Sequence, residues 1–584
     1  MSEPLLSRPF SLQGRAEVLD RLSSEHYDLC VVGGGAVGVG VARDAAMRGL
    51  KVALVEQGDF ASGTSSKSSK LLHGGIRYLE QYAFRLVWEA LHERATLRRL
   101  VPHLAKPVPF LFPIYKGHPV GPLKLDLGLW LYDAMAGSQN LGRHQRLSAG
   151  AMSRMEPRLL TTDLVGGCFY YDAVTDDARL TLETARSAWR HGADLIPFAR
   201  VEEWIEEGGA VRGVRVRDVA LDSRADLLEI RARCLVNATG PWTDGVRGKA
   251  GLERPLLRTT KGVHLLIPKA RLPVPHAIVM LNQPDHRILF VIPWGSLVIV
   301  GTTDTDYDGD PGEVRASAAD VDYILGILRH YFPDQKFARE DVLSTYAGLR
   351  PLVRDTHASA GTTSREHQIL EERPRLFTVA GGKLTTYRIM AAQVVDRVIG
   401  ALKTVGGTKA EMAWPTAGEE IVTASVGDAP RGVDPAVWHH WQEVYGSRAT
   451  KLATLLGEKP DSAWALTAHT PDVATQVMYA ARTEMAVHLD DALSRRTHAL
   501  LAGISLEEAR KAGDAMGEVM GWDAARRAAE VERFAATMRH AHGWKEEGVG
   551  PAAVAVQAPA PSEPESKAAS EPVVSEPTES ETAS

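Results

Sequence analysis

The stretch YDLCVVGGGAVGVGVARDAAMRGLKVALVEQGD, residues 27–59, contains a complete strand–turn–helix–strand unit. Its glycines at 33, 35 and 38 form a G-x-G-x-x-G turn between two short apolar runs, and Glu56 ends the second run. Because Gly33, Gly35 and Gly38 have no Cβ, the backbone can approach a pyrophosphate, and the following helix N-terminus offers it N–H groups. Glu56 is placed to accept hydrogen bonds from a ribose diol. The unit therefore predicts a dinucleotide site, for either NAD or FAD.

Two later segments favour FAD. The first, CLVNATGPWTD (234–244), is a strand ending in small residues, including Gly240, which suits close packing against a nucleotide. The second, RLFTVAGGKLTTYRIMAAQVVDRV (375–398), is a strand, a glycine turn and a helix beginning near Lys383. The positive end of that helix dipole could stabilise negative charge on a reduced flavin ring.

The composition is that of a globular protein with several domains. The chain has 584 residues, 44% of them hydrophobic, and its net charge of 67 − 73 = −6 argues against a nucleic-acid binder. The three cysteines have no C-x-x-C spacing, and no apolar run approaches the roughly 20 residues of a membrane span, so we expect a cytoplasmic protein. We predict a leader (1–26), an oxidoreductase region (27–400), a helical domain (401–545) and a disordered tail (546–584).

Several motifs, in this order, resemble one family. They include HGGIRYLE (73–80), LVNATGPW (235–242), TKGVHLLIP (260–268), AGLRPLV (347–353) and AGGKLTTYR (380–388). Together with the first unit they resemble the FAD-dependent respiratory glycerol-3-phosphate dehydrogenases, within the D-amino-acid-oxidase-like flavoproteins. The resemblance runs from about residue 25 to about residue 540.

The resemblance implies an α/β fold: a Rossmann-like FAD-binding domain, an inserted α+β substrate domain and a C-terminal all-helical domain. It also implies oxidation of sn-glycerol 3-phosphate to dihydroxyacetone phosphate by hydride transfer to flavin N5, with electrons passed to a membrane quinone. The protein would then lie peripherally on the inner face of the cytoplasmic membrane. A homodimer is compatible with this interpretation.

The substrate's chemistry defines the side chains that its site needs. A phosphate dianion calls for cations in fixed geometry, and the hydroxyl group needs a base. Arg77 and Tyr78 in the GGIRY turn can supply donors, and the resemblance adds Arg350, Arg365 and Lys383.

The identity of the base is left open by the sequence. His264 matches a histidine of the family's substrate pocket, and its unperturbed pKa near 6.5 suits a base. His73 is the other candidate, and Arg350 or a water molecule could handle the proton instead. The predicted catalytic residues are His264, Arg350 and Lys383.

The segment SSKSSKLLH (65–73) resembles the loop that wraps the flavin, with N–H and hydroxyl groups directed at the pyrophosphate and the ring edges. Beyond the first glycine turn and Glu56, the predicted cofactor-binding residues are Thr64, Ser65, Ser66, Ser69, Lys70, Leu72, His73, Gly240, Gly382, Lys383, Leu384 and Thr385.

Other interpretations stay open at this point. A flavin oxidase of an amine or 2-hydroxy acid would use the same scaffold. An oxygen-reducing glycerol-3-phosphate oxidase would carry a long insertion, for which the thirty residues between Arg350 and Gly381 leave little room. A flavin-binding scaffold without turnover is the non-enzymatic alternative.

The acidic run GTTDTDYDGD (301–310) lacks the pattern of an EF-hand, so we predict a solvated turn and no metal. Part of the apolar segment 103–135 could face a membrane.

Overall fold

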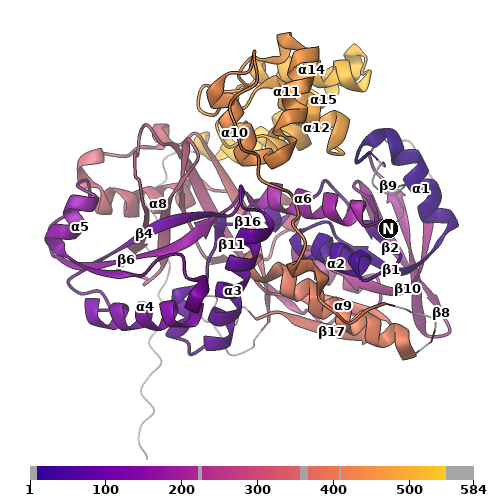
Figure 1. Ribbon diagram of the computed structural model, residues 1–584, viewed down its shortest axis with the longest axis horizontal. Helices are drawn as coiled ribbons and strands as arrows, with labels where there is room; N and C mark the ends of the chain where they lie inside the picture. Colours follow the sequence, from indigo (N-terminus) through magenta and orange to yellow (C-terminus); the bar gives the residue numbers. More distant parts are fainter. Residues whose placement is uncertain (1–8, 221–226, 355–365, 405, 407–409, 548–584) are drawn as a thin grey trace, which may run out of the picture.

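The structure is a computed structural model, which describes residues 9–220, 227–354, 366–404, 406 and 410–547. Arg365 and most of the predicted tail lie outside the described residues. Two α/β lobes lie side by side, and a group of helices, orange to yellow, rests on top of them (Figure 1).

The first lobe is built on the predicted dinucleotide-binding unit. Within the described residues its sheet has eight strands, ordered β17–β18–β10–β1–β2–β7, with β9 pairing to β10 and β8 to β9. The five strands from β18 to β7 run parallel, and their apolar side chains are buried, as a parallel sheet covered on both faces requires. The strands are β1 (His26–Val32), β2 (Val52–Val55), β7 (Asp194–Ile196), β8 (Ala199–Glu207), β9 (Ala210–Asp218), β10 (Leu228–Asn237), β17 (Gln368–Arg373) and β18 (Leu376–Ala380).

Helix α2 (Ala36–Met47) begins at the glycine turn and packs between α6 (Asp177–Arg190) and α9 (Tyr387–Thr404). Gly40 permits this packing, because a Cβ there would lie 3.1 Å from both Ala391 and the Tyr387 ring. Within the predicted leader, α1 (Arg15–Ser24) buries three apolar side chains in the same core, those of Val18, Leu19 and Leu22. The short helix α7 (Thr243–Gly248) follows β10.

The second lobe is built on a larger sheet, whose strands come from two separate stretches of the chain. In the described part, ten strands follow the order β15–β11–β14–β13–β12–β4–β6–β3, with β16 beside β11 and β5 beside β6. The strands are β3 (Leu71–Leu72), β4 (Lys106–Tyr115), β5 (Gln145–Ser148), β6 (Leu164–Val174), β11 (Leu257–Pro268), β12 (Ala277–Leu281), β13 (Ile288–Trp294), β14 (Leu297–Gly301), β15 (Thr305–Asp306) and β16 (Ser344–Val353). Its helices are α3 (Phe84–Leu100), α4 (Pro122–Ala136), α5 (Ala149–Met155) and α8 (Ala318–Tyr331).

The helices on top have their own apolar cores. They are α10 (Pro435–Tyr445), α11 (Ala449–Glu458), α12 (Ala474–Thr483), α13 (Leu489–Asp491), α14 (Leu506–Met520) and α15 (Ala524–His542). We call residues 435–547 the helical region. Two buried ion pairs fasten it to the first lobe: Arg496 to Asp59 at 2.7 Å and Glu484 to Arg179 at 2.5 Å.

This arrangement confirms the predicted fold class, with a Rossmann-like sheet, an inserted α+β part and a C-terminal helical part. Among the described helices, none is both long enough and apolar enough to cross a membrane.

Candidate active site

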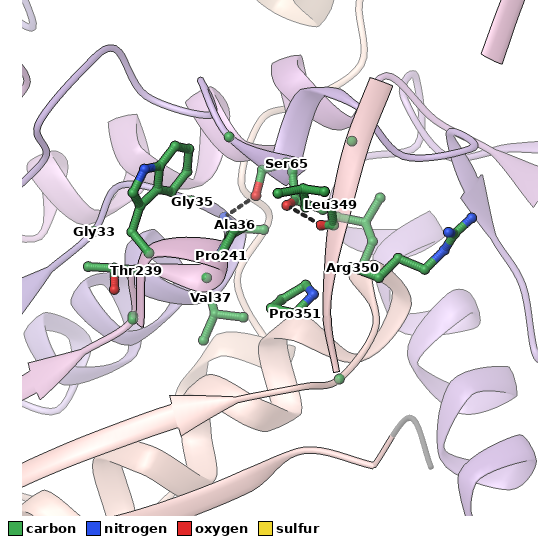
Figure 2. A pocket seen from close by; sticks show the side chains of 18 of the residues that line it. Gly33, Gly35, Ala36, Val37, Ser65, Thr239, Pro241, Leu349, Arg350 and Pro351 are labelled. Carbon is green, nitrogen blue, oxygen red and sulfur yellow. Dashed lines mark hydrogen bonds between the residues drawn. The ribbon is translucent and has the colours of Figure 1, made fainter. Parts of the chain in front are cut away.

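A cavity of about 480 Å³ lies between the two lobes. Its walls include the carboxyl ends of β1 and β2 on one side and the strands β11 and β16 on the other. Figure 2 shows the glycine turn and the start of α2 facing β16, which carries Leu349, Arg350 and Pro351. The carboxyl ends of parallel strands are where open α/β sheets bind nucleotides. We call this space the cofactor cavity.

The glycine turn leaves no room for side chains. Gly33 has φ +113°, and a Cβ on it would lie 2.6 Å from the carbonyl oxygen of Ala238. A Cβ on Gly38 would lie 1.9 Å from the carbonyl oxygen of Gly33. The turn is therefore a cradle that only glycines can form, and the N-terminus of α2 opens directly from it. Its shape and the positive dipole end of α2 fit the pyrophosphate of FAD.

Glu56, at the end of β2, holds the same turn in place. Its carboxylate accepts hydrogen bonds from the N–H groups of Gly34 at 2.6 Å and Gly58 at 2.8 Å. Burial raises the pKa of the Glu56 carboxyl, while these two donors favour its ionised form. The carboxylate lines the cavity, and a carboxylate with two such bonds retains acceptor capacity for a ribose hydroxyl.

The loop of residues 63–73, which we call the cofactor loop, is fastened on three sides. Ser65 Oγ accepts from the Ala36 N–H at 2.9 Å, and Thr64 Oγ1 donates to the Leu349 carbonyl at 2.7 Å (Figure 2). Behind the loop, Asp177 accepts from the N–H of Ser68 at 3.0 Å and from its hydroxyl at 2.7 Å. The loop is thus tied to both lobes, and it closes one wall of the cavity.

The cofactor cavity brings together most of the predicted cofactor-binding residues. Those that line it are Gly33, Gly35, Glu56, Thr64, Ser65, Ser69, His73, Gly240, Gly382, Lys383, Leu384 and Thr385. Four others lie off its wall. Gly38 sits beneath the turn, Leu72 is buried in β3, and Ser66 faces a different cavity. The Lys70 ammonium is turned away toward Asp177, with which it forms a buried ion pair.

Arg350 lies on β16 at the edge of the cavity, and its guanidinium has a fixed direction. It donates to Asp304 Oδ1 at 3.1 Å, to the Thr303 carbonyl at 3.1 Å and to Thr302 Oγ1 at 3.2 Å. Gly262 on β11 makes room for it, because a Cβ there would lie 2.5 Å from Arg350 Nη2. The acidic run at 301–310 therefore orients an arginine.

His264 lies on β11 and is 3% exposed. Its Nε2 atom pairs with Ser69 Oγ at 2.8 Å, and its ring stacks on Tyr346, with centroids 4.7 Å apart. Burial lowers the pKa of His264 well below 6.5, and the positive charges of Arg350 and Lys70 lower it further. His264 is therefore a neutral imidazole at physiological pH, available as a proton acceptor.

Lys383 comes just before the 3₁₀ turn that leads into α9. Its ammonium lies 3.5 Å from the centre of the Tyr78 ring, close enough for a cation–π interaction. Both residues line the cavity, so the structure brings together His264, Arg350, Lys383 and Tyr78. Arg77 is exposed and is not on the cavity wall, because its short 3₁₀ turn (Ile76–Leu79) points neighbouring side chains in different directions.

Sequence reasoning missed three residues that shape this site. Asp177 anchors the cofactor loop, Tyr346 stacks on His264, and the Trp242 ring packs against Gly63. Tyr346 could have been found, because it alternates with Gly348 and Arg350 on one face of β16. Trp242 is part of the GPW motif, but nothing in that motif indicates the partner of its ring.

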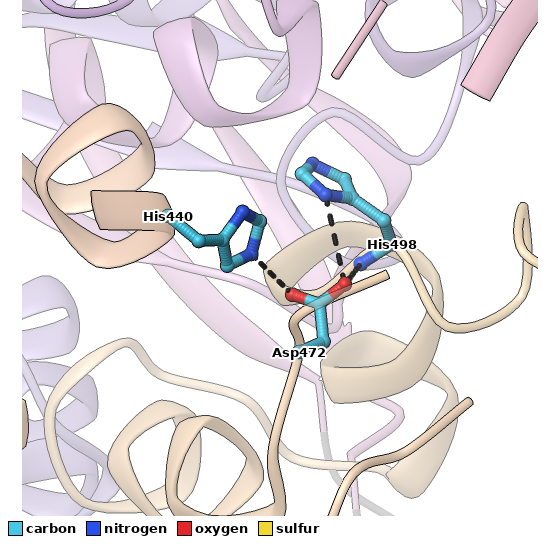
Figure 3. A group of neighbouring side chains, drawn as sticks. All are labelled: His440, Asp472 and His498. Atoms are coloured by element: carbon cyan, nitrogen blue, oxygen red, sulfur yellow. Dashed lines mark hydrogen bonds and ion pairs between the residues drawn. The ribbon is translucent and has the colours of Figure 1, made fainter. Parts of the chain in front are cut away.

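A second group of titratable residues lies in the helical region. Figure 3 shows Asp472 between His440 and His498; His440 Nε2 lies 2.8 Å from Asp472 Oδ1, and the backbone N–H of His498 donates to Oδ2 at 3.1 Å. The Nε2 atom of His498 pairs with Asp176 at 2.8 Å. These atoms lie close enough together to hold a metal ion, but each already has a protein partner. We interpret the group as an ion-pair cluster between the helical region and α6.

The family patterns and relatives agree with this geometry. The FAD dependent oxidoreductase pattern matches residues 28–397, and the C-terminal domain of alpha-glycerophosphate oxidase matches residues 383–527. Glycerol-3-phosphate dehydrogenase 2 of Mycobacterium tuberculosis is 38% identical over 536 residues, which cover 89% of this chain and 90% of the relative. The aerobic glycerol-3-phosphate dehydrogenase of Staphylococcus haemolyticus is 40% identical over 395 residues, covering 67% and 70%.

Among solved structures, the glycerol-3-phosphate dehydrogenase from Bacillus halodurans complexed with FAD has a TM-score of 0.74 at 30% identity. The match covers 91% of this chain and 98% of that one. The glycine cradle, the fold and the matched pattern define a FAD-dependent oxidoreductase. At the identities just given, the chain belongs to the glycerol-3-phosphate dehydrogenase family, as its motifs predicted.

Proposed function

We propose that this protein oxidises sn-glycerol 3-phosphate to dihydroxyacetone phosphate and passes the electrons to a membrane quinone. The proposal rests on the presence of two side chains on the wall of the cofactor cavity. One is an arginine whose guanidinium has a fixed orientation, and the other is a buried, neutral histidine. Bound FAD would supply the hydride acceptor at flavin N5.

Each side chain has a task in this reaction. The Arg350 guanidinium, held by Asp304, binds the substrate phosphate, and the Lys383 ammonium adds a second positive charge. His264 accepts the proton of the secondary hydroxyl at Nε2, the ring nitrogen that pairs with Ser69 Oγ on the cavity wall, because its Nδ1 atom is buried. Tyr346 keeps the imidazole ring in place by stacking on it. The burial of His264 keeps bulk water away from the proton acceptor and strengthens its electrostatic interactions.

An anaerobic titration tests the substrate assignment. Adding sn-glycerol 3-phosphate to the purified yellow protein should bleach the visible flavin band within one turnover, and Arg350→Ala should need far higher substrate concentrations. A flavin that stays oxidised with this substrate but is bleached by an amine or a 2-hydroxy acid would overturn the proposal. Readmission of oxygen gives a second result: slow reoxidation by oxygen and fast reoxidation by a soluble quinone are expected of a dehydrogenase.

An apolar face on the second lobe supports the membrane part of the proposal. Helix α4 is apolar on both faces: Leu125 and Leu129 are buried, whereas Leu123, Leu127 and Trp130 are 69%, 67% and 63% exposed. Tyr82, Phe84 and Trp88 are exposed nearby, around the start of α3, which packs on α4. Exposed leucines rimmed by tryptophan and tyrosine suit the boundary between lipid and water. The quinone, which dissolves in lipid, would approach from this face.

Vesicle sedimentation tests this face. The wild-type protein should pellet with vesicles of anionic phospholipids, and a Leu127→Glu, Trp130→Glu double variant should stay in the supernatant while its flavin is still bleached by substrate. Val426→Glu is the control, because Val426 is 90% exposed at a different place. Vesicle binding unchanged in the double variant would remove α4 from the membrane contact and leave the oxidation reaction unaffected.

A further inference from the structure

A second cavity, of about 430 Å³, lies behind the cofactor loop. The loop forms one wall, Trp294 and Tyr346 of the second lobe form another, and the helical region closes it with residues 488–501 and 533–540. Ser62 and Lys67 line both this cavity and the cofactor cavity. A molecule bound here would therefore touch the reverse side of the loop that holds the flavin.

The carboxylates around this second cavity already have cationic partners. Asp59 pairs with Arg496 and Arg495, which also reaches Asp490 at 3.0 Å and Asp491 at 2.8 Å. Asp176 pairs with His498, and Glu313 lies 3.6 Å from His540. Each of these carboxylates thus has an arginine or histidine partner, and Arg495 is shared by three of them.

Two further cations line the same cavity. Within the described ranges, the ammonium of Lys67 and the guanidinium of Arg533 have neither a hydrogen bond nor an ion pair with the protein. Lys67 is partly buried, with its Cβ packed on the strand at Gly348, whereas Arg533 is exposed at the mouth. Burial and the nearby charge of Arg495 lower the pKa of Lys67 to about 8, although the Asp490 carboxylate acts in the opposite direction, so an anion in direct contact would stabilise its charged form.

A buried histidine, His488, also lines this cavity. His488 is 2% exposed, its Nδ1 atom pairs with Glu530 at 2.8 Å, and its buried Nε2 atom has no hydrogen-bond partner among the described residues. A buried polar atom without a partner is costly, and it commonly marks a position that a ligand or water occupies. The Ser62 and Ser66 side chains add hydroxyl groups to the same wall.

We propose that this second cavity binds a small hydroxylated anion, a phosphate monoester or a carboxylate, separately from the reaction site. The anionic group pairs with Lys67, Arg533 closes over it from the mouth, and a ligand hydroxyl bonds to His488 Nε2. Trp294 and Tyr346 supply the flat apolar wall against which the carbon chain packs. The ligand braces the cofactor loop from behind, so its binding is coupled to that of the flavin.

The test uses the full-length protein loaded with FAD and 3-phosphoglycerate as the probe, titrated calorimetrically at low salt. Because this probe carries a phosphate, it can also enter the reaction site, so an Arg350→Gln variant is titrated in parallel. The Kd should rise about tenfold in Lys67→Met and severalfold in Arg533→Gln, since a buried charge pair contributes more than one at the rim. It should stay within about twofold in Arg350→Gln.

The reverse pattern would overturn the proposal: binding lost in Arg350→Gln and retained in Lys67→Met would place the probe in the reaction site. Absence of heat with both 3-phosphoglycerate and inorganic phosphate at millimolar concentration would overturn it as well. Arg533→Gln tests the site in a variant that is expected to fold normally, because Arg533 is exposed and its substitution disturbs no packing. That variant should bleach with substrate at the wild-type rate.

Discussion

His264 illustrates how a single buried side chain can set the pH behaviour of the reaction. Burial, reinforced by the charges of Arg350 and Lys70, lowers its pKa well below 6.5, so the imidazole is neutral at physiological pH. We therefore expect kcat, which does not report the titration of the free substrate's phosphate, to lack an acid limb near pH 6.5. Replacing the base, in His264→Asn, should lower kcat by roughly 10²–10⁴-fold.

Stopped-flow bleaching of the flavin over pH 5.5–8.5 measures both effects. A wild-type limb near pH 6.5 that disappears in His264→Asn would mean that the imidazole titrates normally and would contradict its neutral state. Full activity in His264→Asn would instead move the base role to His73, the other candidate on the cavity wall.

Gly38 gives a second prediction for a single residue. A Cβ at this position would lie 1.9 Å from the Gly33 carbonyl oxygen, and because this atom belongs to the backbone, no flexible side chain can move aside. Gly38→Ala should therefore widen the turn and abolish FAD retention, measured as the ratio of absorbance at 450 to 280 nm after gel filtration. Gly326→Ala, in α8, is the control, since its Cβ would have no atom within 4 Å. Normal flavin content in Gly38→Ala would contradict the rigid-cradle description.

At the scale of elements, the cofactor loop depends on one carboxylate at the start of α6. Asp177 accepts from the backbone and side chain of Ser68 and pairs with the buried Lys70 ammonium. Asp177→Asn leaves that ammonium buried without its counter-charge, which costs about 3–5 kcal/mol in comparable cases. We expect a lower thermal midpoint and faster loss of FAD on dilution. The exposed Asp20→Asn in α1 serves as the control, and equal FAD loss in both variants would contradict the anchoring role.

The same elements show what the sequence could predict. The glycine turn, α2 and β2 were predictable because their residues are contiguous and each has a recognisable local pattern, from strand to turn to helix. The pairs that build the reaction site are remote: Ser69 and His264 lie 195 positions apart, and Ser68 and Asp177 lie 109 apart. No local pattern specifies such pairs, because they depend on how the two sheets face each other. Lys70 lies in the loop motif that predicted contact with the cofactor. Its ammonium pairs instead with Asp177, which is distant in the sequence and is brought close only by the fold.

At the scale of the whole molecule, the helical region must remain attached to the two lobes. The surfaces meet through buried ion pairs, and removing one partner from such a pair leaves an uncompensated charge. His498 belongs to this junction, because it lies between Asp472 of its own region and Asp176 at the start of α6. Burial alone would lower its pKa, but the negative charge of Asp472 and the bond to Asp176 outweigh burial, so the pKa of His498 is raised. Both carboxyl groups have pKa values below their usual range despite burial, because His440 and His498 face Asp472, and His498 and Lys70 face Asp176.

The sign of the resulting pH dependence follows from these directions. A histidine whose pKa is higher in the folded state stabilises the fold fully below about pH 6.5, its unfolded pKa, and that contribution is lost as pH rises through the folded value. The two aspartates stabilise it above about pH 4, and their contribution is lost as pH falls further. The junction should therefore contribute most to the free energy of unfolding between about pH 4 and 6.5.

His498→Gln removes the cation while keeping a similar volume. It should lower the thermal midpoint strongly at pH 5.5 and less at pH 9, where the wild-type histidine is itself losing its charge. His439→Gln is the matched control, because His439 lies 73% exposed on α10 with only a surface partner, Glu443. Calorimetry at the two pH values, on protein loaded with FAD, gives both differences. A deficit of equal size at pH 5.5 and pH 9 would show that His498 contributes through packing alone, because a titrating ion pair cannot contribute equally on both sides of its pKa.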